Sequence, residues 1–220
     1  MHLKHIKGEE AEGRHDAVFS FTGKSDKDWE ITIEDDHLVD LIMKTNRLGS
    51  KNADLFMYIS EAGNEVDLKA EHINQYIRAT SGEGFTAKNF RTWSATSRCA
   101  ERLAFLSTPH DAKEMKSWIR KLPVVESVQK LWDGNDWSVP NSEFAKNKTM
   151  LAVIDTVAAD LGNTRAVCRS SYIHPWFLDA WMSESLNDKW QEYSDMRRIS
   201  GLSQGESTTL RILKDLRKNM

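Results

Sequence analysis

Tyr172 stands in a stretch of cationic and small polar residues, LGNTRAVCRSSYIHP, which runs from Leu161 to Pro175. Arg165 and Arg169 precede it closely. A phenol oxygen can attack an electrophilic centre to form a covalent intermediate, and guanidinium groups bind phosphate oxygens through paired N–H donors. These residue types in this order predict a tyrosine that attacks a phosphodiester beside an anion-binding site.

Two segments upstream carry further cationic side chains, Ala87–Trp93 (AKNFRTW) and Phe21–Ser25 (FTGKS). Attack on a phosphodiester passes through a more highly charged transition state, which needs donors for the non-bridging oxygens and an acid for the leaving oxygen. Arg91 can hold two phosphate oxygens at once, and Lys24, at the tip of a predicted hairpin, can protonate a leaving 5′ oxygen. Asn163 can donate a hydrogen bond to the phosphate but cannot carry a proton.

The elements that position these residues begin with short strands. His2–Lys7 is expected to be a strand, and Ala17–Thr22 and Trp29–Ile33 flank a polar connection as paired strands do. A helix is predicted to follow, capped by Asp35 and Asp36, with Leu38, Leu41 and Ile42 on its apolar face and Gly49 at its end. Two brief strands, Leu55–Ile59 and Val66–Leu68, are expected around a turn at Ala62–Asn64.

The rest of the chain is predicted to be helical, with recognisable start and stop signals. Ser142 or Asn141 caps a helix whose apolar stripe ends at the Gly162-Asn163 stop signal, so Tyr172 is expected a few residues past a helix end. The first predicted helices are Ala70–Thr80, Thr86–Leu106, and Asp111 to about Asp133, the last interrupted at Pro123. The capped helix that follows carries the apolar stripe Met150, Ile154, Val157 and Leu161. Another helix begins at Pro175, and the last runs from Ser203 to about Leu216 with a Ser203–Glu206 capping box.

Composition predicts one globular domain. Hydrophobic residues make up 40% of the 220 residues, and Cys99 and Cys168 show neither metal-ligand spacing nor a disulfide framework. No signal or membrane-length segment is evident, so we expect a cytoplasmic protein without a membrane partner. The eight tryptophans are expected mostly in or over the core.

The net charge of −3 is unusual for a protein that binds nucleic acid, so only local cationic clusters can provide that function. The candidate clusters are Lys24/Lys27, Lys44/Arg47/Lys51, Arg91/Arg98/Arg102 and Arg165/Arg169.

With its three motif segments in this order, the chain resembles the catalytic domain of the bacterial and poxvirus type IB DNA topoisomerases, from about His2 to about Leu216. The resemblance implies a mainly α fold with a small antiparallel β-hairpin region at the N-terminus (1–34), followed by a mostly helical part (35–220). It also implies that a monomer nicks one strand of double-stranded DNA and reseals it, relaxing supercoils without ATP, metal or cofactor, in a cytoplasmic, nucleoid-associated setting.

The resemblance also implies roles for individual residues. In similar enzymes the tyrosine matching Tyr172 forms a 3′-phosphotyrosine, and the arginine matching Arg91 binds the scissile phosphate. The lysine matching Lys24 is a general acid, and the one matching Lys88 assists near the leaving group. At the position of Asn163, viral members carry histidine and bacterial members commonly asparagine. Contacts with the DNA backbone are then expected from Arg165, Arg169 and Lys27.

Two departures from the family pattern stand out. Asn89 replaces the usual aspartate of the Lys-Asp-Phe-Arg-Thr-Trp motif, at a position that is not catalytic, so a mild effect is expected. Family members also have an N-terminal domain and then a strand with a further catalytic arginine, before the segment that the first residues here resemble. Arg14 is the only arginine ahead of Lys24 and stands in a charged turn, so it is not assigned that role. The chain therefore resembles the catalytic domain without its N-terminal part.

Two alternatives stay open from the sequence. The first is a tyrosine recombinase or integrase, which shares the helical architecture and the arginine-lysine-tyrosine chemistry but has His-x-x-Arg where this chain has Lys88-x-x-Arg91. The second is a catalytically weak DNA-binding remnant, which the absent arginine and the negative net charge favour.

Overall fold

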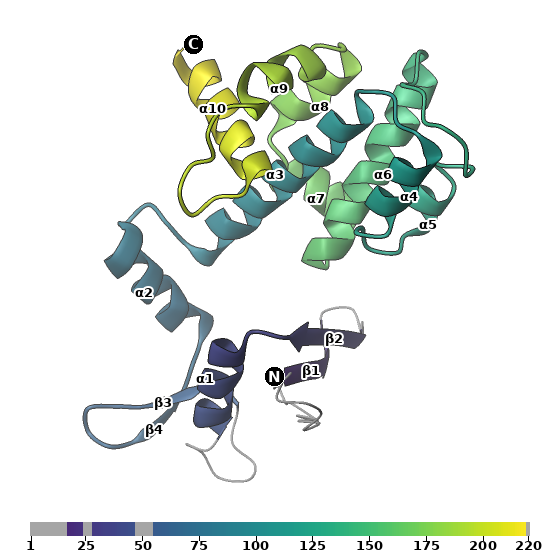
Figure 1. Ribbon diagram of the computed structural model, residues 1–220. Helices are drawn as coiled ribbons and strands as arrows, with labels where there is room; N and C mark the ends of the chain where they lie inside the picture. Colours follow the sequence, from purple (N-terminus) through teal and green to yellow (C-terminus); the bar gives the residue numbers. More distant parts are fainter. Residues whose placement is uncertain (1–16, 24–27, 47–54, 219–220) are drawn as a thin grey trace. The chain divides into compact units, whose positions relative to one another are not determined.

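The computed structural model describes residues 17–23, 28–46 and 55–218. It divides into two compact units, Met1–Gly84 and Phe85–Met220, and each unit is described by itself. The chain is mainly α-helical with short antiparallel strands near its N-terminus, as the sequence predicts (Figure 1). The expected strand His2–Lys7, the turn around Arg14, the hairpin-tip residues Lys24 and Lys27, and Gly49 lie outside the described residues.

The first unit begins with the predicted hairpin. Strand β1 (Ala17–Thr22) pairs antiparallel with β2 (Asp28–Ile33), and Thr22 lies opposite Asp28. Ala17 and Phe19, two residues apart on β1, are both buried, as alternation across a pleated strand requires. The register therefore pairs the last residue of β1 with the first residue of β2.

Helix α1 (Asp36–Asn46) follows, and its start is set by Asp35, whose Oδ1 accepts a hydrogen bond from the Leu38 N–H at 2.9 Å. The predicted apolar face is wrong in part: Leu38 and Leu41 are 47% and 43% exposed. Ile42 is buried as predicted, and Val39 rather than Leu38 or Leu41 packs with it against the hairpin. Leucine spacing alone did not show which of two adjacent stripes would meet a partner.

The remainder of the first unit is a second hairpin and a helix. Strands β3 (Met57–Ile59) and β4 (Glu65–Asp67) pair antiparallel around the predicted turn, where Gly63 adopts a positive φ of 78°. Helix α2 (Ala70–Ser81) follows as predicted, but none of its residues is buried.

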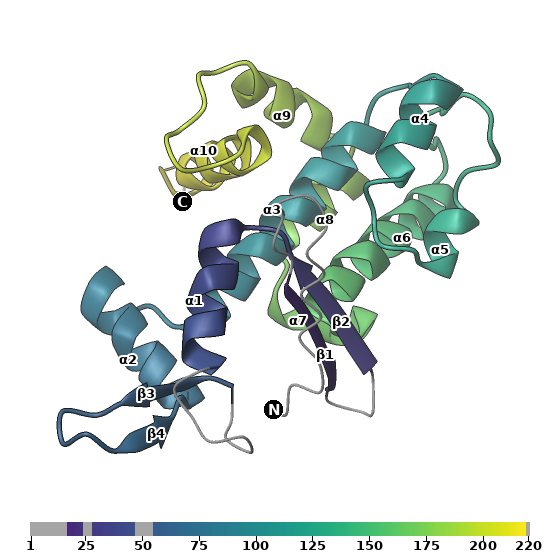
Figure 2. The same ribbon diagram turned by 60° about the horizontal axis from the view of Figure 1, so that its bottom comes forward.

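The second unit is helical, and α3 (Ala87–Leu106) is its central element. It packs against α6, α8, α9 and α10 (Figures 1 and 2). The other helices are α4 (Ala112–Ile119), α5 (Glu126–Gln129), α6 (Glu143–Leu161), α7 (Arg165–Ser171), α8 (Pro175–Met182), α9 (Leu186–Ser194) and α10 (Gln204–Lys218). Among the helices within the described ranges, none combines the length and apolarity needed to cross a lipid bilayer.

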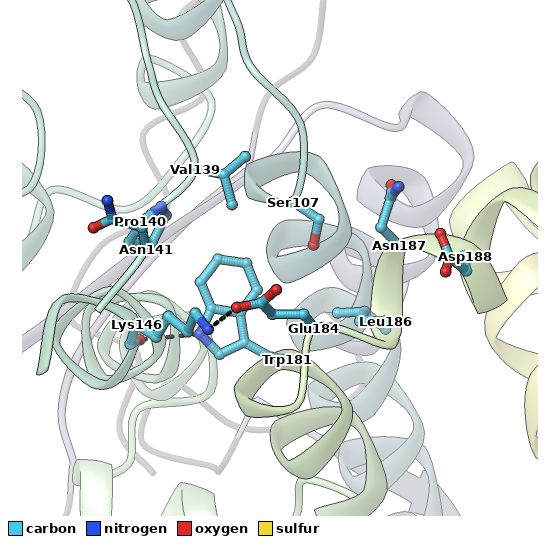
Figure 3. A pocket seen from close by; sticks show the side chains of 10 residues that line it. All are labelled: Ser107, Val139, Pro140, Asn141, Lys146, Trp181, Glu184, Leu186, Asn187 and Asp188. Carbon is cyan, nitrogen blue, oxygen red and sulfur yellow. Dashed lines mark hydrogen bonds and ion pairs between the residues drawn. The ribbon is translucent and has the colours of Figure 1, made fainter. Parts of the chain in front are cut away.

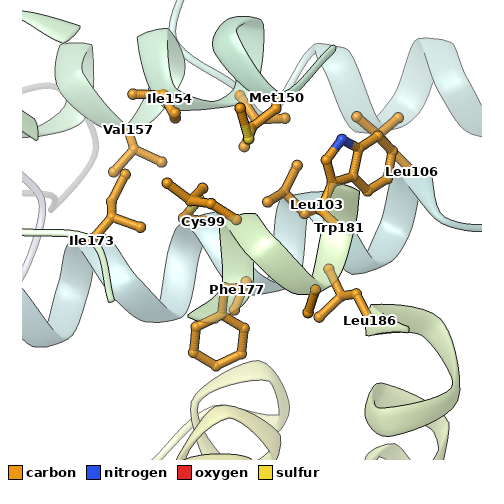
Figure 4. Packing of buried hydrophobic residues seen from close by; sticks show 14 of the residues in the cluster. Cys99, Leu103, Leu106, Met150, Ile154, Val157, Ile173, Phe177, Trp181 and Leu186 are labelled. Carbon is orange, nitrogen blue, oxygen red and sulfur yellow. The ribbon is translucent and has the colours of Figure 1, made fainter. Parts of the chain in front are cut away.

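One hydrophobic core holds this unit together (Figure 4). Cys99 and Leu103 of α3 meet the predicted α6 stripe, of which Met150, Ile154 and Val157 are fully buried, and Phe177 and Trp181 of α8 close the cluster. Of the tryptophans, Trp137 and Trp181 are in the core and Trp118, Trp132, Trp176 and Trp190 pack against it, as the composition predicts.

Capping residues account for most of the helix boundaries. The Asp111 Oδ1 accepts the Glu114 N–H at 2.7 Å, and the Ser142 Oγ accepts the Ala145 N–H at 3.2 Å. The predicted Ser203 capping box is present, because the Ser203 N–H donates to Glu206 Oε2 and the Glu206 N–H donates to Ser203 Oγ.

Two helix predictions need correction. The helix expected from Asp111 to about Asp133 ends at Ile119, and only α5 resumes it, because Pro123 lacks an N–H and disfavours helical backbone in the residue before it. Tyr172 follows directly on α7, a helix between the Gly162-Asn163 stop and the tyrosine that the sequence analysis did not identify. Its signal is Thr164, whose Oγ1 accepts the Val167 N–H at 3.3 Å.

The core predicts a difference between two phenylalanines. Phe177 is 0% exposed, whereas Phe144 is 81% exposed on the first turn of α6. Phe177→Ala should lower the free energy of unfolding by about 3–5 kcal/mol, because it removes buried apolar area and leaves a cavity. Phe144→Ala should change it by less than about 0.5 kcal/mol. Denaturant titration of both variants measures this, and equal effects would contradict the packing described.

Candidate active site

The first turns of α3 present Lys88 and Arg91. The start of this helix is fixed by Asn89, whose Oδ1 accepts hydrogen bonds from the Thr86 N–H at 2.9 Å and from Thr86 Oγ1 at 2.8 Å. An amide oxygen performs this capping as a carboxylate would, so the local structure keeps its geometry with asparagine in place of the motif's aspartate.

Arg91 reaches from α3 to the end of α6. Its Nη2 donates to the backbone carbonyl of Leu161 at 2.8 Å, and its Cζ lies 5.3 Å from the centre of the Tyr172 ring. A guanidinium at this distance from an aromatic face is attracted to it electrostatically. The side chain is exposed, and its remaining N–H groups have no other protein partner within the described residues.

Tyr172 is held by its backbone. Its N–H donates to the Cys168 carbonyl at 3.1 Å, and its own carbonyl accepts from Thr96 Oγ1 at 3.0 Å. The ring is half-buried against the core. In the part of the chain that the structure describes, the phenol hydroxyl has no hydrogen-bond partner, so it is not committed to a structural contact.

Asn163 follows the left-handed end of α6. Gly162 has φ 65° and ψ 33°, and the Asn163 N–H donates to the Ala158 carbonyl at 2.8 Å. The Asn163 side-chain Nδ2 is buried and lacks a hydrogen-bond partner among the described residues. An amide donor in this state is a candidate for a ligand oxygen. It lies two residues past Leu161, the residue that anchors Arg91.

Of the site residues predicted from the sequence, the structure thus brings Arg91 and Tyr172 into direct contact and puts Asn163 just beyond the anchor of Arg91. Lys88 is exposed one turn before Arg91, and its side chain is unpaired within the described ranges. Lys24 and Lys27 lie outside those ranges.

Residues 1–197 of the chain match the family described as eukaryotic DNA topoisomerase I, catalytic core. The chain belongs to this family. It is also 26% identical, over 207 residues, to the DNA topoisomerase 1B of Acanthamoeba polyphaga mimivirus, a match that covers 92% of this chain and 50% of the viral protein. The chain therefore spans about half the length of this curated relative. The resemblance to type IB topoisomerases is confirmed.

Within this topoisomerase-family unit, Arg165 and Arg169 differ although the sequence analysis gave them one role. Arg165 forms a two-pronged ion pair with Asp155 of α6, at 2.6 Å from Nε and 2.5 Å from Nη2. Burial raises the pKa of Asp155, but the hydrogen bonds and charge of Arg165 outweigh it and hold this pKa below its usual value. Arg169 is exposed and has no side-chain partner in the described ranges.

The cationic cluster predicted from Arg91, Arg98 and Arg102 is also divided. Arg102 is largely buried and pairs with Asp160 at 2.6 Å and with Thr156 Oγ1 at 2.8 Å, while Arg98 reaches the same Asp160 at 2.9 Å. These contacts join α3 to α6. They neutralise Arg98 and Arg102, which the sequence had suggested as ligand-binding residues. Of the three, only Arg91 points to the candidate site.

The cysteines do not contribute a nucleophile. Cys99 and Cys168 are free and buried in the core. Burial raises the pKa of Cys168 to about 11 and that of Cys99 further, so both are neutral thiols near pH 7. Among the described residues, no group of three or more His, Cys, Asp or Glu side chains is arranged to hold a metal ion.

A pocket of about 310 Å³ lies elsewhere, at the other end of α6 (Figure 3). Lys146 of α6 lines it and pairs with Glu184. Lys146 and Leu161 are fifteen residues apart on one helix, which corresponds to about 22 Å along its axis. The cluster around Tyr172 is therefore distinct from this pocket and lies at the surface where an extended ligand can reach it.

The Arg165–Asp155 pair predicts a pH-dependent stability. The pKa of Asp155 is lower in the folded state than in the unfolded state. Its carboxylate therefore adds to the free energy of unfolding above the unfolded pKa of about 3.9, and this stabilisation is lost as pH falls through the folded pKa. Asp155→Asn should lower the free energy of unfolding at pH 7 by about 0.5–1 kcal/mol, since the pair is partly solvent-screened. The difference from wild type should shrink below about pH 4.

Urea unfolding of both proteins from pH 3 to 7 measures this difference. Asp179→Asn is the matched control, because Asp179 is exposed on α8 and its carboxylate is unpaired within the described residues. A difference that grows on acidification would show that Asp155 is not held as an ion pair.

Proposed function

We propose that this chain acts as a type IB DNA topoisomerase, which nicks one strand of duplex DNA through a 3′-phosphotyrosine at Tyr172 and then reseals it to relax supercoils. The observation that carries this proposal is the contact between Arg91 and Tyr172, in which the guanidinium lies over the phenol ring while Leu161 holds it in place. A phosphate bound by the free N–H groups of Arg91 would lie beside the phenol oxygen.

The covalent step balances with protein groups and water. The Tyr172 oxygen attacks phosphorus as its proton passes to solvent water, the bond from phosphorus to the 5′ oxygen breaks, and Lys24 supplies the proton that this oxygen takes up. Arg91 and the Asn163 amide donate to the non-bridging oxygens, and Lys88 assists near the leaving group. Reversal returns the proton and reseals the strand, so neither nucleotide nor metal is consumed.

The expected partner is double-stranded DNA bound by a monomer, in a cytoplasmic, nucleoid-associated setting and without a membrane or a cofactor. Family membership and the name of the mimivirus relative support the topoisomerase over the recombinase alternative. Asn163 agrees with the bacterial form of the motif, whereas this relative is viral. Of Arg165 and Arg169, Arg169 is the better placed for a backbone contact, because Arg165 already has an acidic partner.

Covalent capture tests the nucleophile. Incubated in EDTA with duplexes that carry 5′-bridging phosphorothiolates, the wild type should become attached to DNA, and peptide mapping should place the adduct on Tyr172. Tyr172→Phe should form no adduct, because it lacks the attacking oxygen. Tyr193→Phe, on α9, is the control and should react normally. An adduct with Tyr172→Phe, or a requirement for magnesium, would contradict the mechanism, and an inactive wild type would favour the DNA-binding remnant.

The same substrate separates two roles. A thiolate leaves without protonation, so Lys24→Ala should be slow on normal DNA and restored on the phosphorothiolate. Arg91→Ala should be slow on both, since stabilisation of the phosphate oxygens is still missing. Loss of one such donor commonly lowers the rate on the order of 10²–10³-fold. Equal restoration of both variants would remove Lys24 from the acid role.

Salt dependence separates Arg169 from Arg165. Each phosphate contact that is lost should lower the slope of log affinity against log salt by about 0.9. Arg169→Ala should show this change, and Arg165→Ala a smaller one, because Asp155 already neutralises Arg165. Asp155→Asn, which frees Arg165, should steepen the slope. Equilibrium binding from about 50 to 200 mM salt measures all three, and an affinity indifferent to salt would contradict DNA-backbone binding.

A further inference from the structure

We propose that Thr96 is a positioning residue that sets where the Tyr172 nucleophile stands relative to the phosphate held by Arg91. The inference rests on the proposed function, because it concerns the geometry of that attack. Thr96 does not touch the reacting atoms. It acts through the backbone of the turn that carries the tyrosine.

One hydroxyl bonds to both sides of this turn. Thr96 Oγ1 donates to the Tyr172 carbonyl at 3.0 Å and accepts from the His174 N–H at 3.1 Å. Thr96 is 3% exposed, and Ile173, the residue between the two bonded peptide groups, is also buried. A buried hydroxyl that acts as donor and acceptor at once uses its one donor and one of its two lone pairs, and so fixes both peptide groups.

Helical hydrogen bonds reach only part of this turn, which lies between the end of α7 and Pro175, the first residue of α8. The Tyr172 and Ile173 N–H groups still donate to the Cys168 carbonyl, both at 3.1 Å, and the Phe177 N–H donates to the His174 carbonyl at 3.3 Å. Among the described residues, the partner of the Tyr172 carbonyl and of the His174 N–H is Thr96. Thr96 therefore bonds the two peptide groups of the turn that the helices leave unpaired.

Thr96 lies on the same helix as Arg91. The two residues are five positions apart, which corresponds to about 7.5 Å along the axis of α3. Arg91 fixes one point of this helix to the end of α6 through Leu161, and Thr96 fixes a second point to the turn after α7. The Tyr172 ring lies under the guanidinium as a result of both attachments. The phosphate ligand and the nucleophile are thus placed by one rigid helix.

Removal of the hydroxyl should displace the nucleophile without removing any DNA contact. In Thr96→Val the side-chain shape is kept, but the Tyr172 carbonyl and the His174 N–H lose their partner. A buried donor or acceptor without a partner is unfavourable, so the turn is expected to shift until these two groups find other partners. A displacement of about 1 Å in a reacting group lowers a rate on the order of 10²-fold.

The test measures single-turnover cleavage at saturating DNA, together with the dissociation constant. Thr96→Val should cleave 10- to 100-fold more slowly, on the order expected for a misplaced nucleophile, with unchanged DNA affinity. Thr96→Ser, which keeps the hydroxyl, should restore the rate. Thr209→Val is the matched control, because Thr209 is also buried but, among the described residues, its hydroxyl bonds only to the Gly205 carbonyl of its own helix, at 2.8 Å.

A second readout does not depend on catalysis. Hydrogen exchange at the His174 amide should be faster in Thr96→Val than in the wild type and Thr96→Ser, and unchanged in Thr209→Val. Unchanged exchange, or full cleavage by Thr96→Val, would overturn the inference. An inactive wild type with faster exchange in Thr96→Val would instead overturn the proposed function. Should Thr96→Val fail to fold, Thr96→Ala takes its place in both comparisons.

Discussion

The close contact between α3 and α6 is the constraint on which the rest of the helical unit depends. Small side chains on α3, Ala95 and Cys99, let the two helices approach, and the buried stripe of α6 fills the contact. Asp160 of α6 then draws in Arg98 and Arg102 from α3. Breaking such a buried pair by removing one partner is strongly destabilising, so the two helices have little freedom to slide. This fixed contact puts the end of α6 within reach of Arg91.

Local signals in the sequence were sufficient for most of the architecture. Thr86, Ser142 and Ser203 begin helices where the capping pattern predicts, and Gly162 ends α6 in the left-handed conformation that glycine allows. These features succeed because each depends on residues within four positions of one another. Helix α7 was not predicted because it is short and because its N-cap, Thr164, directly follows the Gly162-Asn163 stop signal of α6.

Long-range pairing could not be predicted in the same way. Arg165 looked like a ligand-binding residue because its partner, Asp155, lies ten positions earlier on another helix. Arg102 looked the same, yet its carboxylate partner Asp160 comes from α6. A cluster of like charges in sequence therefore says little about which charge is free until the opposite charges are placed in space. The contact of Arg91 with Tyr172 was predicted only as a shared function, and the structure adds its geometry.

Glu206 of α10 both caps its own helix and accepts the indole N–H of Trp93 at 3.1 Å, a contact that spans 113 positions of the chain. The contacts of Arg91 and Thr96 with the α6–α8 region span 70 and 76 positions. Contacts between residues so far apart in sequence form late, because the intervening chain must first be made and closed into loops. During synthesis, α3 therefore leaves the ribosome long before the helix that braces Trp93 exists. A nascent chain that ends before α10 therefore holds α3 without the brace at Trp93.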